Sequence, residues 1–523
     1  MAGFLDVVLR GLALAGQAMA MGGVLFALYV LRAATPDGRA EESRIRRALL
    51  LIALGALGVI VAQALARTVQ FATLADDSGW PLQAVFATDF FRATLLKAVL
   101  CLLILAGALA LRRSPGRRRG WLALTALTAL LAISAALTSH AAARLAHRAP
   151  LLAFDALHQL GAAVWVGGLI HLVAAVAPGK RQPPWPAALL TRFSAMSLTA
   201  VVILVTAGAG LSVYYIDGLR ALVGTGYGLM VLTKVAILGA LLGLGAINFF
   251  TVRKLPSGAP VPLEGLRRYV EVELGLGLTV LFAAASLTSL PPAVDVVADR
   301  ATPAEVGTRF TPQWPRLSSP PIEALPVGDR EAPRTDEDQA WSEYNHHVAG
   351  LFVLAMGLLV IMNRLGVGWA RHWPLIFLGM AAFLLVRNDP GSWPLGPEGF
   401  WEGMTRPEVL QHRLFVVLVV GFGVFEWMVR TGRVTSPRCG LVFPILCAVG
   451  GVLLLTHSHA SLNLKAEYLT EVTHAPLGVL ALAAAWGRWL ELRLPPAEGR
   501  LPGRIWATSL TLVGVLLLLY RES

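Results

Sequence analysis

Charged residues and cysteines are scarce in this sequence of 523 residues. Asp, Glu, Lys and Arg make up 15% of the chain, whereas apolar residues make up 56%. So few charges do not cover the surface of a water-soluble protein of this size. The three cysteines, Cys101, Cys439 and Cys447, form no CxxC pair. The sequence therefore indicates neither a disulfide framework nor a thiolate metal site.

Motifs of ATP-driven pumps and of common hydrolases are also missing. The chain contains no GxxxxGK[ST] phosphate loop, no Asp-Lys-Thr-Gly phosphorylation site, and no HExxH or GxSxG sequence. These absences remove the easiest enzymatic interpretations, and we expect a protein that is not an enzyme. The net charge of +12 comes mostly from short loops between apolar segments. It predicts contact with anionic lipid head groups and no binding of nucleic acid.

Long apolar stretches fill most of the chain. Each is long enough to cross ~30 Å of hydrocarbon as a helix. Their predicted bounds are 5–31, 48–73, 84–111, 121–139, 154–177, 193–215, 227–250, 269–290, 345–363, 372–387, 412–429, 440–457, 471–488 and 505–520. The sequence thus predicts an all-α fold, a polytopic integral membrane bundle of about 14 transmembrane helices. The first stretch follows no basic segment, so we expect an uncleaved first helix.

Arginine-rich and arginine-poor loops alternate along the chain, and this alternation predicts the orientation. The arginine-rich loops lie within 39–47, 112–119, 180–181, 253–268, 430–438 and 493–504. The positive-inside rule assigns them to the cytoplasm, so both termini are expected on the outer side of the membrane. All histidines except His171 and His372 then fall at outer helix ends or in outer loops. These are His140, His147, His158, His346, His347, His412, His457, His459 and His474.

One long segment, residues 291–344, lacks apolar periodicity and is rich in proline and acidic residues. It follows a helix that runs outward, so we expect a periplasmic linker with disordered parts. The linker separates an eight-helix block, residues 1–290, from a six-helix block, residues 345–523.

The eight-helix block contains short sequence matches that recur in the same order. An even number of helices per unit predicts a tandem four-helix repeat whose halves share one orientation, whereas chance similarity among Ala-, Leu- and Gly-rich helices is the alternative. In the first match, Gly16 and Met21-Gly22-Gly23 correspond to Gly161 and Val166-Gly167-Gly168. In the second, Thr88-Asp89-Phe90 and Lys97 correspond to Thr225-Gly226-Tyr227 and Lys234. In the third, Leu137-Thr138-Ser139-His140 corresponds to Leu287-Thr288-Ser289-Leu290.

A helix end of one pattern occurs in both blocks. The stretch ending at His140 resembles Leu455-Thr456-His457-Ser458-His459, and each is followed by an acid-x-x-His sequence, Asp155 with His158 and Glu471 with His474. Residues at i and i+3 share a helix face. We therefore expect each acid to orient its histidine or to join it as a ligand. The alternative is that the acids only stabilise a helix start.

Imidazoles without thiolates and with few carboxylates suit copper, zinc, nickel or haem iron, and disfavour calcium or magnesium. We expect one metal site in each block. The candidate ligands are His140, His158 and Asp155 in the first block and His346, His347, His412, His457, His459, His474 and Glu471 in the second. Haem b stays an alternative, because His158 and His171 are spaced by ~20 Å on one helix, although no other span carries such a pair.

Two lysines, Lys97 and Lys234, lie inside predicted spans, where an ammonium group needs a partner. We expect Asp89 to pair with one of them or with Arg92. The lysines then hold the bundle together or, alternatively, set the field of an ion path.

An ordered set of residues resembles the CopD copper-resistance membrane family over about 154–255. The set is Asp155-x-x-His158, Trp165-Val166-Gly167-Gly168-Leu169, Arg192-Phe193-Ser194, Thr206, Thr225-Gly226-Tyr227-Gly228, Lys234 and Asn248. The six-helix block is similar to the C-terminal extension of long members of that family. The resemblance implies an inner-membrane protein that takes copper from the periplasm and moves it into or across the membrane, with a separate periplasmic CopC-like copper carrier as partner. The alternatives are a haem-binding membrane redox protein and a factor that inserts copper into a membrane cuproenzyme.

Overall fold

The computed structural model describes residues 2–32, 38–78, 86–176, 187–254, 263–325, 335–456 and 463–522. These residues form helices and no β-strand, with one isolated bridge between Ser392 and Glu398. Fourteen of the helices are long and apolar enough to cross a membrane, and each coincides with a predicted span. The prediction of an all-α polytopic membrane bundle is therefore confirmed. Apart from a short stretch after Leu455, the chain divides into two compact units, Met1–Arg300 and Ala301–Ser523.

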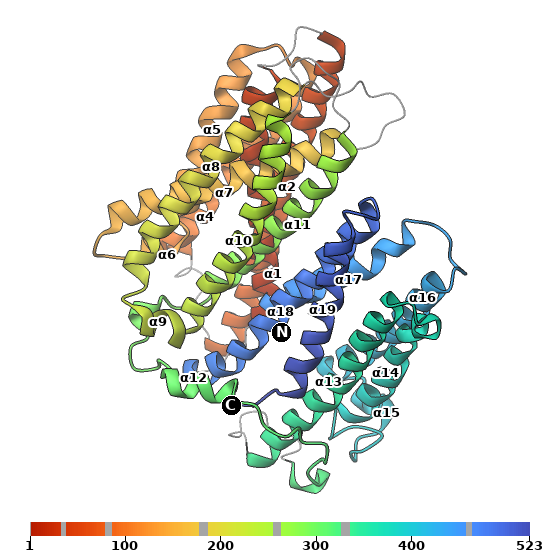
Figure 1. The fold of residues 1–523 in the computed structure, drawn as a ribbon. Helices are drawn as coiled ribbons and strands as arrows, with labels where there is room; N and C mark the ends of the chain where they lie inside the picture. Colours follow the sequence, from red (N-terminus) through yellow and green to blue (C-terminus); the bar gives the residue numbers. More distant parts are fainter. Residues whose placement is uncertain are drawn as a thin grey trace. The chain divides into compact units, whose positions relative to one another are not determined.

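The first unit, red to green in Figure 1, contains eight of the spanning helices. They are α1 (Ala2–Leu25), continued by the π-helix η1 (Phe26–Leu31), α2 (Gly38–Ser78), α4 (Asp89–Arg113), α5 (Arg118–Ala136), α7 (Arg148–Val176), α8 (Ala187–Tyr215), α10 (Gly226–Arg253) and α11 (Leu263–Leu287). The short helices α6 (His140–Ala143), α9 (Leu219–Gly224) and η2 (Ala293–Asp295) lie between or after them. Threonine caps start two of the helices, since Thr88 accepts from the Phe91 N–H and Thr225 from the Gly228 N–H. Such caps satisfy N–H groups that have no partner inside the helix.

Helices α1 and α7 approach so closely that only glycine fits at their contact. A Cβ atom on Gly22 would lie 2.2 Å from the Ala163 carbonyl oxygen, and one on Gly167 would lie 1.9 Å from the Ala18 carbonyl oxygen. Gly167 follows Gly22 by 145 residues, and Ala163 follows Ala18 by the same 145. The contact is therefore reciprocal.

A second pair of close contacts obeys the same spacing. A Cβ atom on Gly16 of α1 would lie 2.8 Å from the Gly55 carbonyl oxygen of α2, and one on Gly161 of α7 would lie 2.9 Å from the Ala200 carbonyl oxygen of α8. All four positions again match at a spacing of 145 residues. Matched contacts of this kind are what two four-helix units in one orientation require. They favour the tandem repeat over chance similarity.

The second unit, green to blue in Figure 1, contains the other six spanning helices. They are α13 (Asp336–Arg364), α14 (Ile376–Arg387) with the preceding 3-10 helix η4 (Gly368–Leu375), α16 (Pro407–Arg430), α17 (Val442–Thr456) with η5 (Cys439–Leu441), α18 (Leu464–Arg493) and α19 (Arg500–Leu518). Shorter helices are α12 (Pro303–Arg309), η3 (Ile322–Ala324) and α15 (Phe400–Gly403). Met356, Trp373, Phe443 and Trp506 form the centre of the packed core. Burial of such large apolar side chains stabilises contacts between helices that are distant in sequence.

The predicted linker contains more regular structure than its composition indicates. Thr302 and Glu305 form a capping box at the start of α12, and Thr335 and Asp338 form another at the start of α13. The second capping box extends α13 back to residue 336, whereas the apolar pattern predicted a start at 345. Lys465 of α18 forms an ion pair of 2.5 Å with Glu305. The Lys465 ammonium lowers the pKa of the Glu305 carboxyl group to about 2.

Candidate functional site

A chain of polar side chains joins α1 to α7 in the first unit. Gln17 donates a hydrogen bond of 3.1 Å to Gln159, which in turn donates one of 2.7 Å to Asp155. The charges of Lys97 and Lys234 both act on the Asp155 carboxyl group. Asp155 on α7 is therefore within electrostatic range of the two lysines on α4 and α10.

Asp89, the partner expected for one of these lysines or for Arg92, pairs with the arginine. It pairs with Arg92 at 3.6 Å, and its side chain is 95% exposed. Of the two expected partners of Asp89, the structure selects the arginine that follows it by one helical turn. Lys97, by contrast, is buried.

His158 is held by one ring nitrogen. Its Nδ1 lies 2.9 Å from the Leu204 carbonyl oxygen of α8. Because a carbonyl only accepts, Nδ1 carries the proton and Nε2 carries the lone pair. No hydrogen bond to this Nε2 occurs within the described residues. A histidine fixed through one nitrogen with the other open is the usual arrangement of a metal ligand.

His140 offers a second open nitrogen in the same unit. It begins α6, where the Ser139 hydroxyl accepts from the Ala141 N–H. Its Nε2 is buried and has no hydrogen-bond partner among the described residues, while the ring bonds to the Leu287 backbone. Burial lowers the pKa of His140 below its ordinary value of 6.5, which favours the neutral ring that binds metals.

Histidines 346 and 474 lie side by side in the second unit. Their Nδ1 atoms lie 2.8 Å from the carbonyl oxygens of Ser342 and Thr470, respectively. Each Nδ1 therefore donates, and each Nε2 carries a lone pair. The two ring centroids are 5.9 Å apart and the ring planes meet at 80°. The Tyr520 ring stacks on His346 at 4.0 Å and contacts His474 at 5.5 Å.

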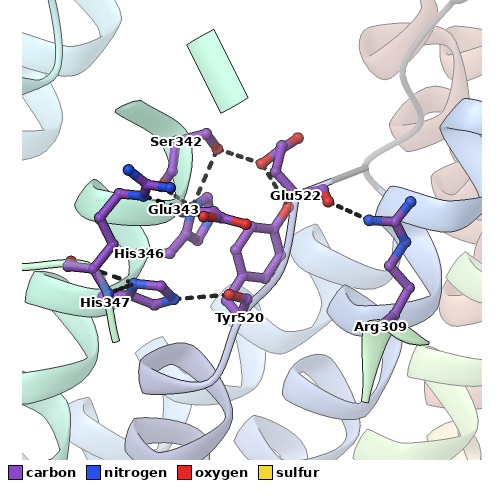
Figure 2. Close-up of polar contacts among 8 residues, drawn as sticks. Arg309, Ser342, Glu343, His346, His347, Tyr520 and Glu522 are labelled. Carbon is purple, nitrogen blue, oxygen red and sulfur yellow. Dashed lines mark hydrogen bonds and ion pairs between the residues drawn. The ribbon is translucent and has the colours of Figure 1, made fainter. Parts of the chain in front are cut away.

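The C-terminal segment after α19 completes this cluster, as Figure 2 shows. The Tyr520 hydroxyl donates a hydrogen bond of 2.9 Å to the Glu522 carboxylate, and the Ser342 hydroxyl donates to the same carboxylate oxygen. Arg309 of α12 donates to the Glu522 backbone carbonyl. Both Tyr520 and Glu522 are buried. Sequence reasoning missed them because neither forms part of a recurrent motif.

His347 has a different arrangement from its neighbour. Its Nδ1 accepts from the Arg316 N–H at 2.7 Å, and its Nε2 donates to the Tyr520 carbonyl oxygen at 2.8 Å. Both ring nitrogens are therefore occupied, and no lone pair is left for a metal ion. In this arrangement His347 holds the C-terminal segment.

The remaining candidates of the second block are His412, Glu471, His457 and His459. His412 of α16 donates from Nδ1 to the Asp389 carboxylate at 2.8 Å, a carboxylate–histidine pair that the sequence motifs did not indicate. Glu471 is buried on α18. His457 and His459 lie outside the described residues. Across the described part of the chain, no group of three or more His, Cys, Asp or Glu side chains is arranged to hold a metal ion.

Two family models match segments of the first unit. Residues 1–147 match the N-terminal domain of copper resistance protein D-like proteins, and residues 187–287 match copper resistance protein D. Asp155 and His158 lie between the two matched segments. A copper transport protein of Bacillus subtilis (strain 168), CutJ, is 34% identical over 163 residues.

That alignment covers 31% of this chain and 29% of CutJ, so the chain matches under a third of this relative's length. No solved structure matches the chain. The fourteen candidate spans and the two matched domains agree with the resemblance found in the sequence. Two segments of this multi-pass membrane chain, residues 1–147 and 187–287, are thus similar to domains of copper resistance protein D.

Proposed function

We propose that the protein binds copper ions at the periplasmic ends of its helices and moves copper into or across a bacterial inner membrane. The observation that carries this proposal is the hydrogen bonding of the His158, His346 and His474 rings. Each donates from Nδ1 to a backbone carbonyl and keeps the Nε2 lone pair for a ligand. The two matched copper-resistance domains and the similarity to the copper transport protein CutJ support copper as that ligand.

One site belongs to the first unit. Its ligands are His140 and His158, and Asp155 lies one helical turn before His158 on α7. Asp155 supplies negative charge close to an incoming cation, whereas Lys97 and Lys234 limit how strongly that cation is held. Moderate binding is what a transport path requires, because the ion must also leave.

The second site belongs to the six-helix block. His346 and His474 supply its paired imidazoles, whereas His412, His457, His459 and Glu471 are candidate ligands of this block outside that pair. We assign His347 to positioning of the C-terminal segment rather than to the metal. In this scheme copper reaches both sites from the periplasm, delivered by a separate CopC-like carrier, and the protein performs no chemical conversion.

The test is copper loading and uptake by the purified full chain. The wild-type protein is expected to carry copper with little haem, and its proteoliposomes are expected to take up copper. His158→Ala should lower both measurements, whereas His372→Ala should change neither, because the His372 Nδ1 already accepts from the Trp427 indole N–H. A strong Soret band without copper would support the redox alternative. Copper binding without uptake would support the insertion factor.

A further inference from the structure

The geometry of the pair formed by His346 and His474 bears on how many ligands a bound copper ion has and on its oxidation state. Metal–nitrogen bonds of about 2 Å place the centroids of two imidazoles on one ion roughly 5 to 6.5 Å apart. The observed separation of 5.9 Å lies inside this range. The separation of the two rings is therefore compatible with both imidazoles binding one ion.

Tyr520 fixes the orientation of both rings. It stacks on His346 with an angle of 24° between the ring planes and meets His474 at 73°. Its own position is held at both ends, since its carbonyl accepts from His347 Nε2 and its hydroxyl donates to Glu522. Ring contacts with Tyr520 thus limit the rotation of both imidazoles.

The Glu522 carboxylate supplies a negative charge that compensates the charge of a bound cation. Its carboxylate is buried, and both the Ser342 and the Tyr520 hydroxyl groups donate to it. Its charge acts on His346. Two neutral imidazoles add no charge of their own, so this carboxylate compensates one unit of positive charge at the pair.

We propose that His346 and His474 form a two-coordinate Cu(I) site, with Tyr520 as its positioning residue and Glu522 as its compensating charge. This inference rests on the proposed function and adds the oxidation state and the coordination number. Cu(I) is monovalent and accepts two nitrogen ligands, whereas Zn(II) is held by four ligands and Cu(II) by tetragonal sets of nitrogen and oxygen. The pair therefore selects Cu(I) over both divalent ions.

The experiment uses the full chain with His140→Ala and His158→Ala, so that the first-unit ligands do not contribute. Anaerobic titration with Cu(I) against bicinchoninate is expected to show tight binding at the second unit. His346→Ala or His474→Ala should each abolish this binding, because one imidazole does not suffice. X-ray absorption of the bound copper should show two nitrogen neighbours, and excess Zn(II) should not displace it.

Two further variants separate positioning from folding. Tyr520→Ala should weaken Cu(I) binding by roughly 10- to 100-fold, as loss of a supporting group does at other metal sites. Tyr520→Phe keeps the stacked ring and should retain most of the affinity. His346→Met should recover Cu(I) binding but not Zn(II) binding, because a thioether is a soft ligand. This recovery shows that loss in the alanine variant is not a folding defect.

Several outcomes would overturn the inference. Undiminished Cu(I) binding in the His346→Ala, His474→Ala double variant would show that copper binds elsewhere, which leaves the proposed function intact. Four neighbours in the absorption spectrum, or displacement by Zn(II), would exclude a two-coordinate Cu(I) site while copper binding remains. Failure of the wild-type chain to bind copper at all would contradict the proposed function itself.

Discussion

Gln159 joins two helices by accepting a hydrogen bond of 3.1 Å from Gln17 and donating one of 2.7 Å to Asp155. The acid that precedes His158 by one helical turn is therefore positioned from α1 as well as from its own helix. Side-chain amides suit this role because one group both donates and accepts.

Replacing this amide tests its contribution. Gln159→Leu removes a donor to Asp155 and leaves the Gln17 amide group without its acceptor, so we expect a loss of about 1–3 kcal/mol in the free energy of unfolding together with slower copper uptake. Chemical unfolding in detergent and proteoliposome uptake measure the two effects. Gln63→Leu is the matched control, since the Gln63 side-chain oxygen has no hydrogen-bond partner among the described residues. Equal losses in both variants would contradict the proposed link.

Acid should destabilise the first unit through His140. Because burial lowers the folded-state pKa of His140 below 6.5, the unfolded chain takes up a proton first as the pH falls. The contribution of His140 is therefore complete above that ordinary value and decreases as the pH falls toward the lowered folded-state pKa. Unfolding measured across this window should show a smaller decrease for His140→Gln than for wild type. Identical slopes would show that this ring does not control the transition.

The number of copper ions bound per protein should distinguish the proposed metal site of one unit from that of the other. Replacing His140 and His158 together with alanine should lower bound copper by about half, and replacing His459 and His474 should remove the remainder. The reason is that a metal needs ligands from at least two chain segments, and each unit supplies two. Elemental analysis of the purified variants gives the measurement. Complete loss from either pair alone would instead indicate one shared site.

Orientation in the membrane is open to a direct measurement. In a background with Cys101, Cys439 and Cys447 changed to serine, cysteines introduced within 291–344 should react with a membrane-impermeant thiol reagent in intact spheroplasts. Cysteines placed within 113–119 should not, because the positive-inside rule assigns this arginine-rich loop to the cytoplasm. The reverse labelling pattern would place the histidines on the cytoplasmic side and remove the argument for periplasmic copper.

The spanning helices were predictable from sequence because apolar length is a local property of the chain. The start of α13 was missed since its first turn is acidic, although the Thr335 and Asp338 capping box is itself a local signal. The contacts of His346 and His347 were not predictable. These neighbours share one helix, yet their proton positions differ because one ring meets a carbonyl of its own helix and the other meets Arg316 and Tyr520.

Contacts between side chains that are far apart in the sequence were also not predictable. Asp389 pairs with His412 across 23 positions of the chain, and Glu522 meets Ser342 across 180. Such pairs follow from how helices pack, which no short motif encodes. The recurrent Asp155 and His158 motif did indicate where one open imidazole lies.

The reciprocal contact of Gly22 with Ala163 and of Gly167 with Ala18 is the kind of contact that a homodimer joined into one chain would make. A single four-helix unit with this glycine would associate with a second copy of itself through the same surface. The candidate ligands, however, do not recur. At a spacing of 145 residues, Ala13 stands where the other half has His158, and Arg10 stands where it has Asp155. In the aligned Leu-Thr-Ser pattern, Leu290 is the sequence counterpart of His140. The proposed site thus needs His140 from one half and His158 from the other, and a four-helix unit built from the first half alone would be expected to dimerise without a complete copper site.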